Sequence, residues 1–146
     1  MQAGSPVDEQ LIEEAKQARA EAYAPYSQFR VGAAVRTRSG QIFRGCNVEN
    51  SSYGGTVCAE RIALFHAYVH GERAIEALAV VVDTVQPCPP CGFCRQVILE
   101  LGGDIEIYLA NLRGDIRRFT AKELLPEAFT SDFLAHPSPV VSSENV

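Results

Sequence analysis

The N-terminal part of the chain carries apolar residues at helical spacing. Asp8 is a suitable N-cap with acidic residues behind it, and Pro25 ends the pattern, so we predict an amphipathic helix from Asp8 to about Tyr23. The positions that mark its apolar face are Leu11, Ile12, Ala15, Ala18, Arg19 and Ala22. Such a helix is expected to pack one side against the core.

Two stretches with the residue pattern of strands follow, at Phe29–Arg38 and Gln41–Val48. The turn signal Ser39-Gly40 lies between them, so together they predict a β-hairpin. The next segment, Glu49–Val57, is rich in Asn, Ser and Gly, which indicates a loop. This loop leads directly to a cysteine, Cys58, at the start of the next predicted helix.

The middle of the chain alternates helical and strand patterns. A second helix, from Cys58 to about Tyr68, is apolar almost all round, so we expect it to be buried against a sheet. Its apolar residues include Ile62, Leu64, Phe65, Ala67 and Val69. The valine-rich run Ala77–Val82 predicts a central strand that is covered on both faces. A third helix is predicted at Arg95–Leu101, ended by Gly102-Gly103.

Two short alternating segments near the C-terminus predict the last strands, Ile105–Ala110 and Ile116–Phe119. The five residues between them are too few for a parallel crossover, so this pair must be antiparallel. A final helical stretch is predicted over about Ala121–Ala135, with an interruption at Pro126.

Length and composition indicate one globular domain over residues 1–146, with a core at about 8–135 and flexible tails at 1–7 and 136–146. The chain has 146 residues, of which 47% are hydrophobic and 21% charged. No apolar run approaches the roughly 20 residues of a membrane span, and nothing resembles a signal peptide, so we expect no membrane partner and a cytoplasmic location. The net charge of −5 argues against nucleic acid as a partner.

The cysteine pattern suits a metal better than disulfides, because the number is odd and three of the five lie within seven residues. Cys91 and Cys94, at positions i and i+3 of an opening helical turn, would point their sulfurs the same way. Cys88 and Cys91 are separated by two prolines, which would hold their Cα atoms roughly 9 Å apart. We therefore select Cys58, Cys91 and Cys94, since three ligands leave a fourth tetrahedral position open for water, as in catalytic zinc sites.

Charged residues beside these cysteines suggest further roles. Glu60 is a carboxylate that need not be a ligand, and it can reach the site only if Cys58 lies at or before the first helical turn. Three thiolates around a dication carry a net charge of −1, which Arg61 and Arg95 could offset. The alternatives are a structural zinc with Cys88 as fourth ligand, a redox CxxC pair, and buried thiols without a metal.

Taken together, these motifs resemble the small homotetrameric cytidine deaminases. The resemblance rests on Ala24-Pro25-Tyr26-Ser27, Val31-Gly32-Ala33-Ala34, Gly45-Cys46-Asn47-Val48-Glu49-Asn50, Cys58-Ala59-Glu60-Arg61, Pro90-Cys91-Gly92-Phe93-Cys94-Arg95-Gln96 and Glu123-Leu124-Leu125-Pro126. It implies a three-layer α/β fold around a five-stranded mixed sheet. It also implies one Zn²⁺ per subunit, held between two helix N-termini, and a homotetramer whose active sites are completed by neighbouring subunits.

The resemblance also implies roles for individual residues in hydrolytic deamination of cytidine and 2′-deoxycytidine, a reaction of pyrimidine salvage. It assigns zinc to Cys58, Cys91 and Cys94, proton transfer to Glu60, the ribose to Asn47 and Glu49, the base to Phe29 and the backbone at Ala59, and a neighbouring subunit's site to Phe129. Without the resemblance, both phenylalanines could be ordinary core, and Asn47 and Glu49 an ordinary polar turn.

Two related activities are alternatives. A deaminase of nucleoside antibiotics, similar to blasticidin deaminase, would share the zinc motif and the Glu-Leu-Leu-Pro segment, but the segments Pro25–Phe29 and Asn47–Asn50 favour cytidine. Deaminases of polynucleotides are disfavoured by the acidic charge and by the short connection at residues 111–115.

Overall fold

Five strands form one sheet in the order β2-β1-β3-β4-β5 in the computed structural model, which describes residues 6–134. The strands are β1 (Val31–Thr37), β2 (Ile42–Cys46), β3 (Ile75–Val82), β4 (Glu106–Ala110) and β5 (Ile116–Thr120). Strand β1 pairs antiparallel with both β2 and β3, whereas β3 and β4 are parallel. Strands β4 and β5 are antiparallel, as the short connection between them predicts.

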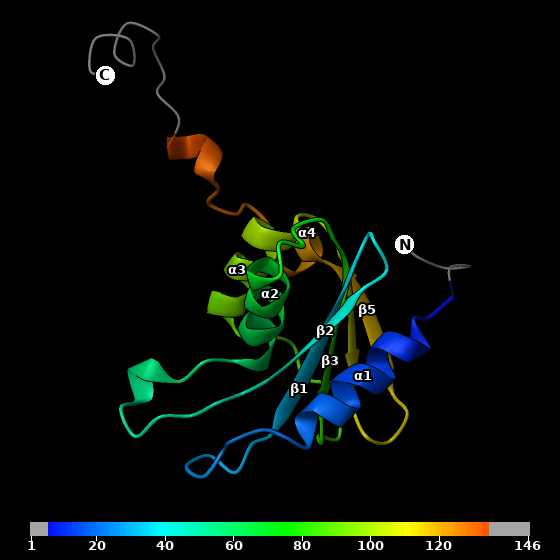
Figure 1. Cartoon of the computed structure of the whole chain (residues 1–146), viewed down its shortest axis with the longest axis vertical. Helices are drawn as coiled ribbons and strands as arrows, with labels where there is room; N and C mark the ends of the chain where they lie inside the picture. Colours follow the sequence, from blue (N-terminus) through cyan, green and yellow to red (C-terminus); the bar gives the residue numbers. More distant parts are fainter. Residues whose placement is uncertain (1–5, 135–146) are drawn as a thin grey trace, which may run out of the picture.

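Helices cover both faces of this sheet (Figure 1). Helix α1 (Glu9–Arg19) lies on one face, and α2 (Ala59–Val69) and α3 (Gly92–Gly102) lie side by side on the other, with the short α4 (Ala121–Leu124) beside them. The three-layer α/β fold around a mixed five-stranded sheet is therefore confirmed. Within residues 6–134, none of the helices has the length and apolarity needed to cross a membrane.

Strand β3 is the central strand, and its side chains alternate between two apolar clusters. Leu78, Val80 and Val82 belong to the cluster that includes α2 and α3, whereas Ala79 and Val81 belong to the cluster that includes α1. All five are buried, which explains why this segment is almost continuously apolar in sequence.

Helix α1 begins as predicted but ends four residues early. Asp8 is the N-cap, and its Oδ1 accepts a hydrogen bond from the Leu11 N–H at 3.1 Å. The helix ends at Arg19 rather than near Tyr23, because the Tyr23 N–H donates to the carbonyl of Asn47 at 2.9 Å. Residues 20–23 therefore lie outside the helix, because Tyr23 bonds to a loop that is distant in sequence.

The expectations for α2 and for the last helix were partly wrong. Helix α2 buries only one face, because Phe65 and Val69 are exposed to solvent. The stretch predicted as Ala121–Ala135 contains the four-residue α4 and a separate 3₁₀ turn at Ser131–Leu134, while Ala135 lies outside the described residues. Helix α4 ends because Leu125, the residue before Pro126, leaves helical geometry with a φ of −145°, and Glu127 follows with a positive φ of 53°.

Candidate active site

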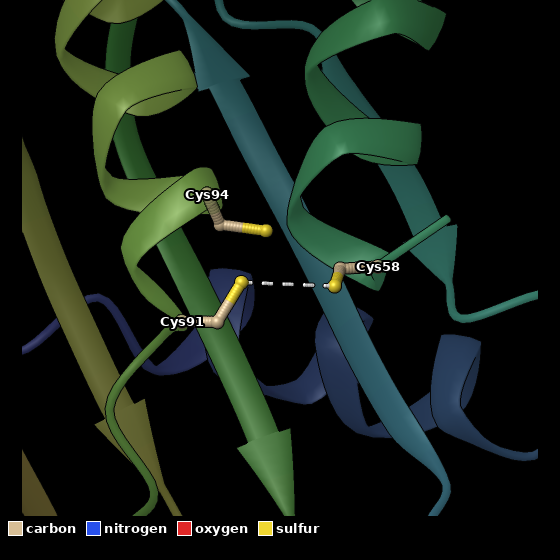
Figure 2. A group of neighbouring side chains, drawn as sticks. All are labelled: Cys58, Cys91 and Cys94. Atoms are coloured by element: carbon tan, nitrogen blue, oxygen red, sulfur yellow. Dashed lines mark hydrogen bonds between the residues drawn. The ribbon is translucent and has the colours of Figure 1, made fainter. Parts of the chain in front are cut away.

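Three cysteines come together at the N-terminal ends of helices α2 and α3 (Figure 2). Cys58 is the N-cap of α2, Cys91 is the N-cap of α3, and Cys94 lies in the first turn of α3. Their Sγ atoms lie within 4.8 Å of one another, with 4.0 Å between those of Cys58 and Cys91. Residues 33 positions apart along the chain therefore converge at one point.

The geometry of this thiol cluster, Cys58, Cys91 and Cys94, fits a tetrahedral metal ion. Sulfurs about 2.3 Å from one ion, at tetrahedral angles, would lie about 3.8 Å apart. The 4.0 Å between the sulfurs of Cys58 and Cys91 is close to this value, and soft thiolate donors at two helix N-termini favour zinc. The three residues selected from sequence could therefore hold a zinc ion.

Cys88 lies outside this cluster. Among residues 6–134, the group of metal-ligating atoms within reach of one another comprises the three cysteines alone. The Cys88 Sγ instead lies 3.5 Å from the carbonyl of Pro89 and lines the adjoining cavity. Burial, with the nearby Glu60 charge, raises the pKa of the Cys88 thiol. This position does not favour Cys88 as a fourth ligand of a closed structural site.

Hydrogen bonds stabilise a negative charge on Cys58. Bonds from the Cys94 thiol and the Arg61 guanidinium lower the pKa of Cys58 to about 5, despite the opposing effect of burial. The Arg61 Nη2 lies 3.5 Å from the Cys58 Sγ. The pKa of Cys94 is raised by its bond to the Cys58 thiolate and by burial. The surroundings of the Cys58 sulfur therefore favour its thiolate form.

Arg61 and Arg95 have different surroundings. Arg61 contacts sulfur, and the Phe93 ring lies against its guanidinium at 4.3 Å from the ring centroid. Arg95 donates to the carbonyls of Pro90 and Leu124 at 2.8 and 2.9 Å, so it links the start of α3 to α4. Of the two arginines chosen from sequence, the structure brings Arg61 to the sulfurs.

Glu60 lies beside the thiol cluster in the first turn of α2. Its side chain is 4% exposed, and it lines the same cavity as Cys58 and Cys91. Burial, together with the charge on Cys58, raises the pKa of the Glu60 carboxyl to about 7, although a backbone hydrogen bond and Arg61 act in the opposite direction. Cys58 is the N-cap and so lies before the first turn of α2, which is the position that Glu60 requires in order to reach the site.

A cavity of about 460 Å³ opens beside these groups, which is a suitable size for a small molecule. Its walls come from the hairpin, the loop after it, β3 and the segment before α3. The lining residues are Ser27, Phe29, Val31, Asn47, Glu49, Thr56, Cys58, Glu60, Val80, Val82, Cys88, Pro89, Pro90 and Cys91. Sequence reasoning identified six of them as site residues, those at positions 29, 47, 49, 58, 60 and 91. It missed Ser27, although this residue belongs to the motif Ala24-Pro25-Tyr26-Ser27.

Asn47 and Glu49 hold the loop that forms one wall of the cavity. The Asn47 Nδ2 donates to the Phe29 carbonyl at 2.7 Å, and its Oδ1 accepts from the Val31 N–H at 2.9 Å. The Glu49 carboxylate accepts from the N–H groups of Tyr26 and Ser27 at 2.9 and 3.1 Å, and from the Ser27 hydroxyl. The Ser27 hydroxyl is the main cause of the lowered pKa of Glu49.

Two remaining candidates, Ala59 and Phe129, are not among the residues that line the cavity. Ala59 is fully buried as the first residue of α2. Phe129 is 59% exposed, stacks on Phe133 with 6.0 Å between ring centroids, and accepts a hydrogen bond at its carbonyl from Gln96 at 2.8 Å. The structure does not bring the Phe129 side chain to the cavity of its own chain.

Comparison with known proteins shows extensive similarity. Residues 5–110 match the family described as the cytidine and deoxycytidylate deaminase zinc-binding region. The chain is 58% identical over 123 residues to a cytidine deaminase of Halalkalibacterium halodurans (84% of this chain, 93% of that protein). It is 53% identical over 129 residues to one of Sporosarcina psychrophila (88% and 95%).

The fold is similar to solved structures as well. The crystal structure of cytidine deaminase from Burkholderia pseudomallei superposes with a TM-score of 0.82 at 54% identity. The match covers 85% of this chain and all of that one. The likeness therefore extends over most of the fold.

Proposed function

Because the chain belongs to the cytidine and deoxycytidylate deaminase family and is a deaminase enzyme, we propose that it converts cytidine and 2′-deoxycytidine to uridine, 2′-deoxyuridine and ammonia. The observation that carries this proposal is the buried carboxyl of Glu60, in one cavity with Cys58 and Cys91. A carboxyl group with a pKa of about 7 can both accept and return a proton near neutral pH.

Cys58, Cys91 and Cys94 are proposed to hold one zinc ion per subunit. When bound, the ion supplies Lewis-acid chemistry that makes a water molecule nucleophilic near neutral pH. Arg61 is proposed to offset part of the thiolate charge, since its guanidinium contacts the Cys58 sulfur. We assign this role to Arg61 rather than Arg95, because Arg95 is bonded to backbone carbonyls.

Glu60 is proposed to move the protons of the reaction. It accepts a proton from the attacking water and delivers it to N3 of the cytosine ring, while the water oxygen bonds to C4. It then takes the remaining proton of that hydroxyl and gives it to the amino group, which leaves as ammonia when the C4–N bond breaks. Glu60 is only 4% exposed, which supports this role, because burial disfavours the charged carboxylate and so allows the group to be protonated during the reaction.

The cavity walls are proposed to bind the nucleoside. Phe29 would lie beside the base, the backbone at Ala59 would contact the pyrimidine, and Asn47 and Glu49 would receive the ribose. We further propose that Phe129 reaches the site of a neighbouring subunit in a homotetramer. The five cysteines form no disulfide, which supports a proposed location in the reducing cytoplasm. Pyrimidine salvage is proposed from the substrates, cytidine and 2′-deoxycytidine.

The decisive experiment compares the wild type with Glu60→Gln by loss of cytidine absorbance and by zinc content. We expect equal zinc in both proteins and a loss of turnover of at least about 10²-fold in the variant, because an amide cannot carry the proton. Robust turnover by Glu60→Gln would contradict the mechanism. Turnover of blasticidin S but not of cytidine or 2′-deoxycytidine by the wild type would contradict the substrate.

Two cysteine variants provide the controls. Cys58→Ala should lose both zinc and activity, which separates loss of the metal from loss of the proton carrier. Cys88→Ser should keep zinc and measurable turnover, because Cys88 lies outside the thiol cluster. Loss of zinc from Cys88→Ser would favour the alternative of a closed structural site.

A further inference from the structure

The C-terminal end of helix α2 carries two histidines that the proposed reaction does not use. His66 lies in the last turn and His70 is the C-cap, so the two residues are four positions apart on one side of the helix. Both are exposed, and their ring centroids are 5.0 Å apart. We propose that His66 and His70 form a binding site for a divalent late transition metal ion such as Ni²⁺, Cu²⁺ or Zn²⁺.

Hydrogen bonds leave one nitrogen of each ring available to a metal. The His66 Nδ1 lies 3.1 Å from the carbonyl of Arg44, and the His70 Nδ1 lies 2.9 Å from the carbonyl of His66. A carbonyl oxygen can only accept, so in the neutral form of each ring the Nδ1 carries the proton and the Nε2 has a free lone pair. A donor bond from the second ring nitrogen to a carbonyl is the usual arrangement of histidines that bind metals.

Phe43 holds both imidazoles in place. Its ring centroid is 5.1 Å from that of His66 and 5.1 Å from that of His70, and the Phe43 side chain is itself buried. The three rings therefore form a packed group between β2 and α2. Ligands that are already ordered lose less conformational entropy when the ion binds.

The position in the helix also favours a cation. The carbonyl end of a helix carries partial negative charge, and His70 lies at that end of α2. Two histidines at i and i+4 on one helix face are a recurrent zinc-binding arrangement. The pair is distinct from the thiol cluster, because Cys58 and His70 cap opposite ends of α2, about 18 Å apart at 1.5 Å per residue.

The test is a calorimetric titration of the untagged, zinc-loaded protein with Ni²⁺, which does not oxidise thiols. We expect one Ni²⁺ to bind without release of zinc. His66→Gln and His70→Gln should each lower the affinity at least tenfold, and the double variant should show no binding. His136→Gln, the same substitution at the third histidine, should bind like the wild type.

Three outcomes would overturn the proposal: no Ni²⁺ binding by the wild type, unchanged affinity in either single variant, or zinc release in proportion to the Ni²⁺ bound. Unchanged cytidine turnover and thermal unfolding of the double variant should accompany its loss of Ni²⁺ binding. These two measurements show that the loss is local to the histidine pair and not a consequence of misfolding.

Discussion

Arg61 has the most direct contact with the charge of the thiol cluster among the non-ligand residues. Its Nη2 lies 3.5 Å from the Cys58 sulfur, and its Nε is buried without a hydrogen-bond partner in the described part of the chain. The Phe93 ring lies against the guanidinium and is itself exposed to solvent. An aromatic residue next to Cys94 in sequence therefore helps to hold the arginine that contacts the thiol cluster.

Phe93→Ala should reduce kcat/KM for cytidine about two- to fivefold, the equivalent of a cation–π contact of about 0.5–1 kcal/mol. The reason is that Arg61 would spend less time against Cys58. Steady-state kinetics of Phe93→Ala, Arg61→Gln and the double variant would measure the coupling. An effect of Phe93→Ala that persists undiminished in the Arg61→Gln background would contradict this role.

At the scale of helices and strands, close packing of α2 against β2 positions the thiol cluster. Helix α2 crosses β2 at Gly45, where a Cβ atom would lie 2.4 Å from both the Ala59 carbonyl oxygen and the Ala63 nitrogen. On the opposite face of the sheet, a Cβ atom at Gly32 would lie 2.0 Å from the Ala15 carbonyl oxygen of α1. Only glycine permits these two approaches without a shift of the helices.

Gly45→Ala and Gly32→Ala are therefore a matched pair. Both should lower the thermal midpoint, because overpacking against backbone costs at least about 1–3 kcal/mol. Only Gly45→Ala should also speed the loss of zinc to a chelator, since the displaced helix begins next to Cys58. Thermal unfolding and zinc release would be measured for both variants. Equal zinc release from the two would show that the α2 position does not control the site.

At the scale of the whole molecule, exposed apolar side chains indicate where subunits could associate. Among them are Phe129, Phe133 and Leu134 on the C-terminal segment, and Phe65 and Val69 on α2. The C-terminal segment stands away from the sheet in Figure 1. Large exposed apolar groups mark interaction surfaces, which supports the proposed homotetramer.

Co-expression of two defective chains would test whether Phe129 acts on a neighbouring subunit. Phe129→Ala and Glu60→Gln should each be impaired alone, whereas their mixture should recover up to about one quarter of wild-type sites, by random pairing around a symmetric oligomer. Cys58→Ala with Glu60→Gln is the control, because both defects fall in one chain's own site. No recovery beyond this control would contradict a contribution from the neighbouring subunit.

Local features of the structure were largely predictable from sequence. The hairpin, the central strand and the antiparallel pair β4–β5 depend on spacing and turn residues within short segments, and all are present. Helix ends were less predictable. Helix α1 ends early because of a bond from Tyr23 to Asn47, and the last helix is shorter because Leu125 leaves helical geometry before Pro126.

The sequence by itself was enough to propose the ligand types and the proton carrier, because Cys91 and Cys94 are one helical turn apart and Glu60 follows Cys58 closely. Only the tertiary structure decided that Cys58 meets them, that Cys88 faces the cavity, and that Asn47 and Glu49 hold the loop at residues 26–31. These contacts join segments far apart in the chain. They form because the strands pair and because two helix N-termini pack on the same face of the sheet. Local residue patterns do not specify which distant segments come into contact.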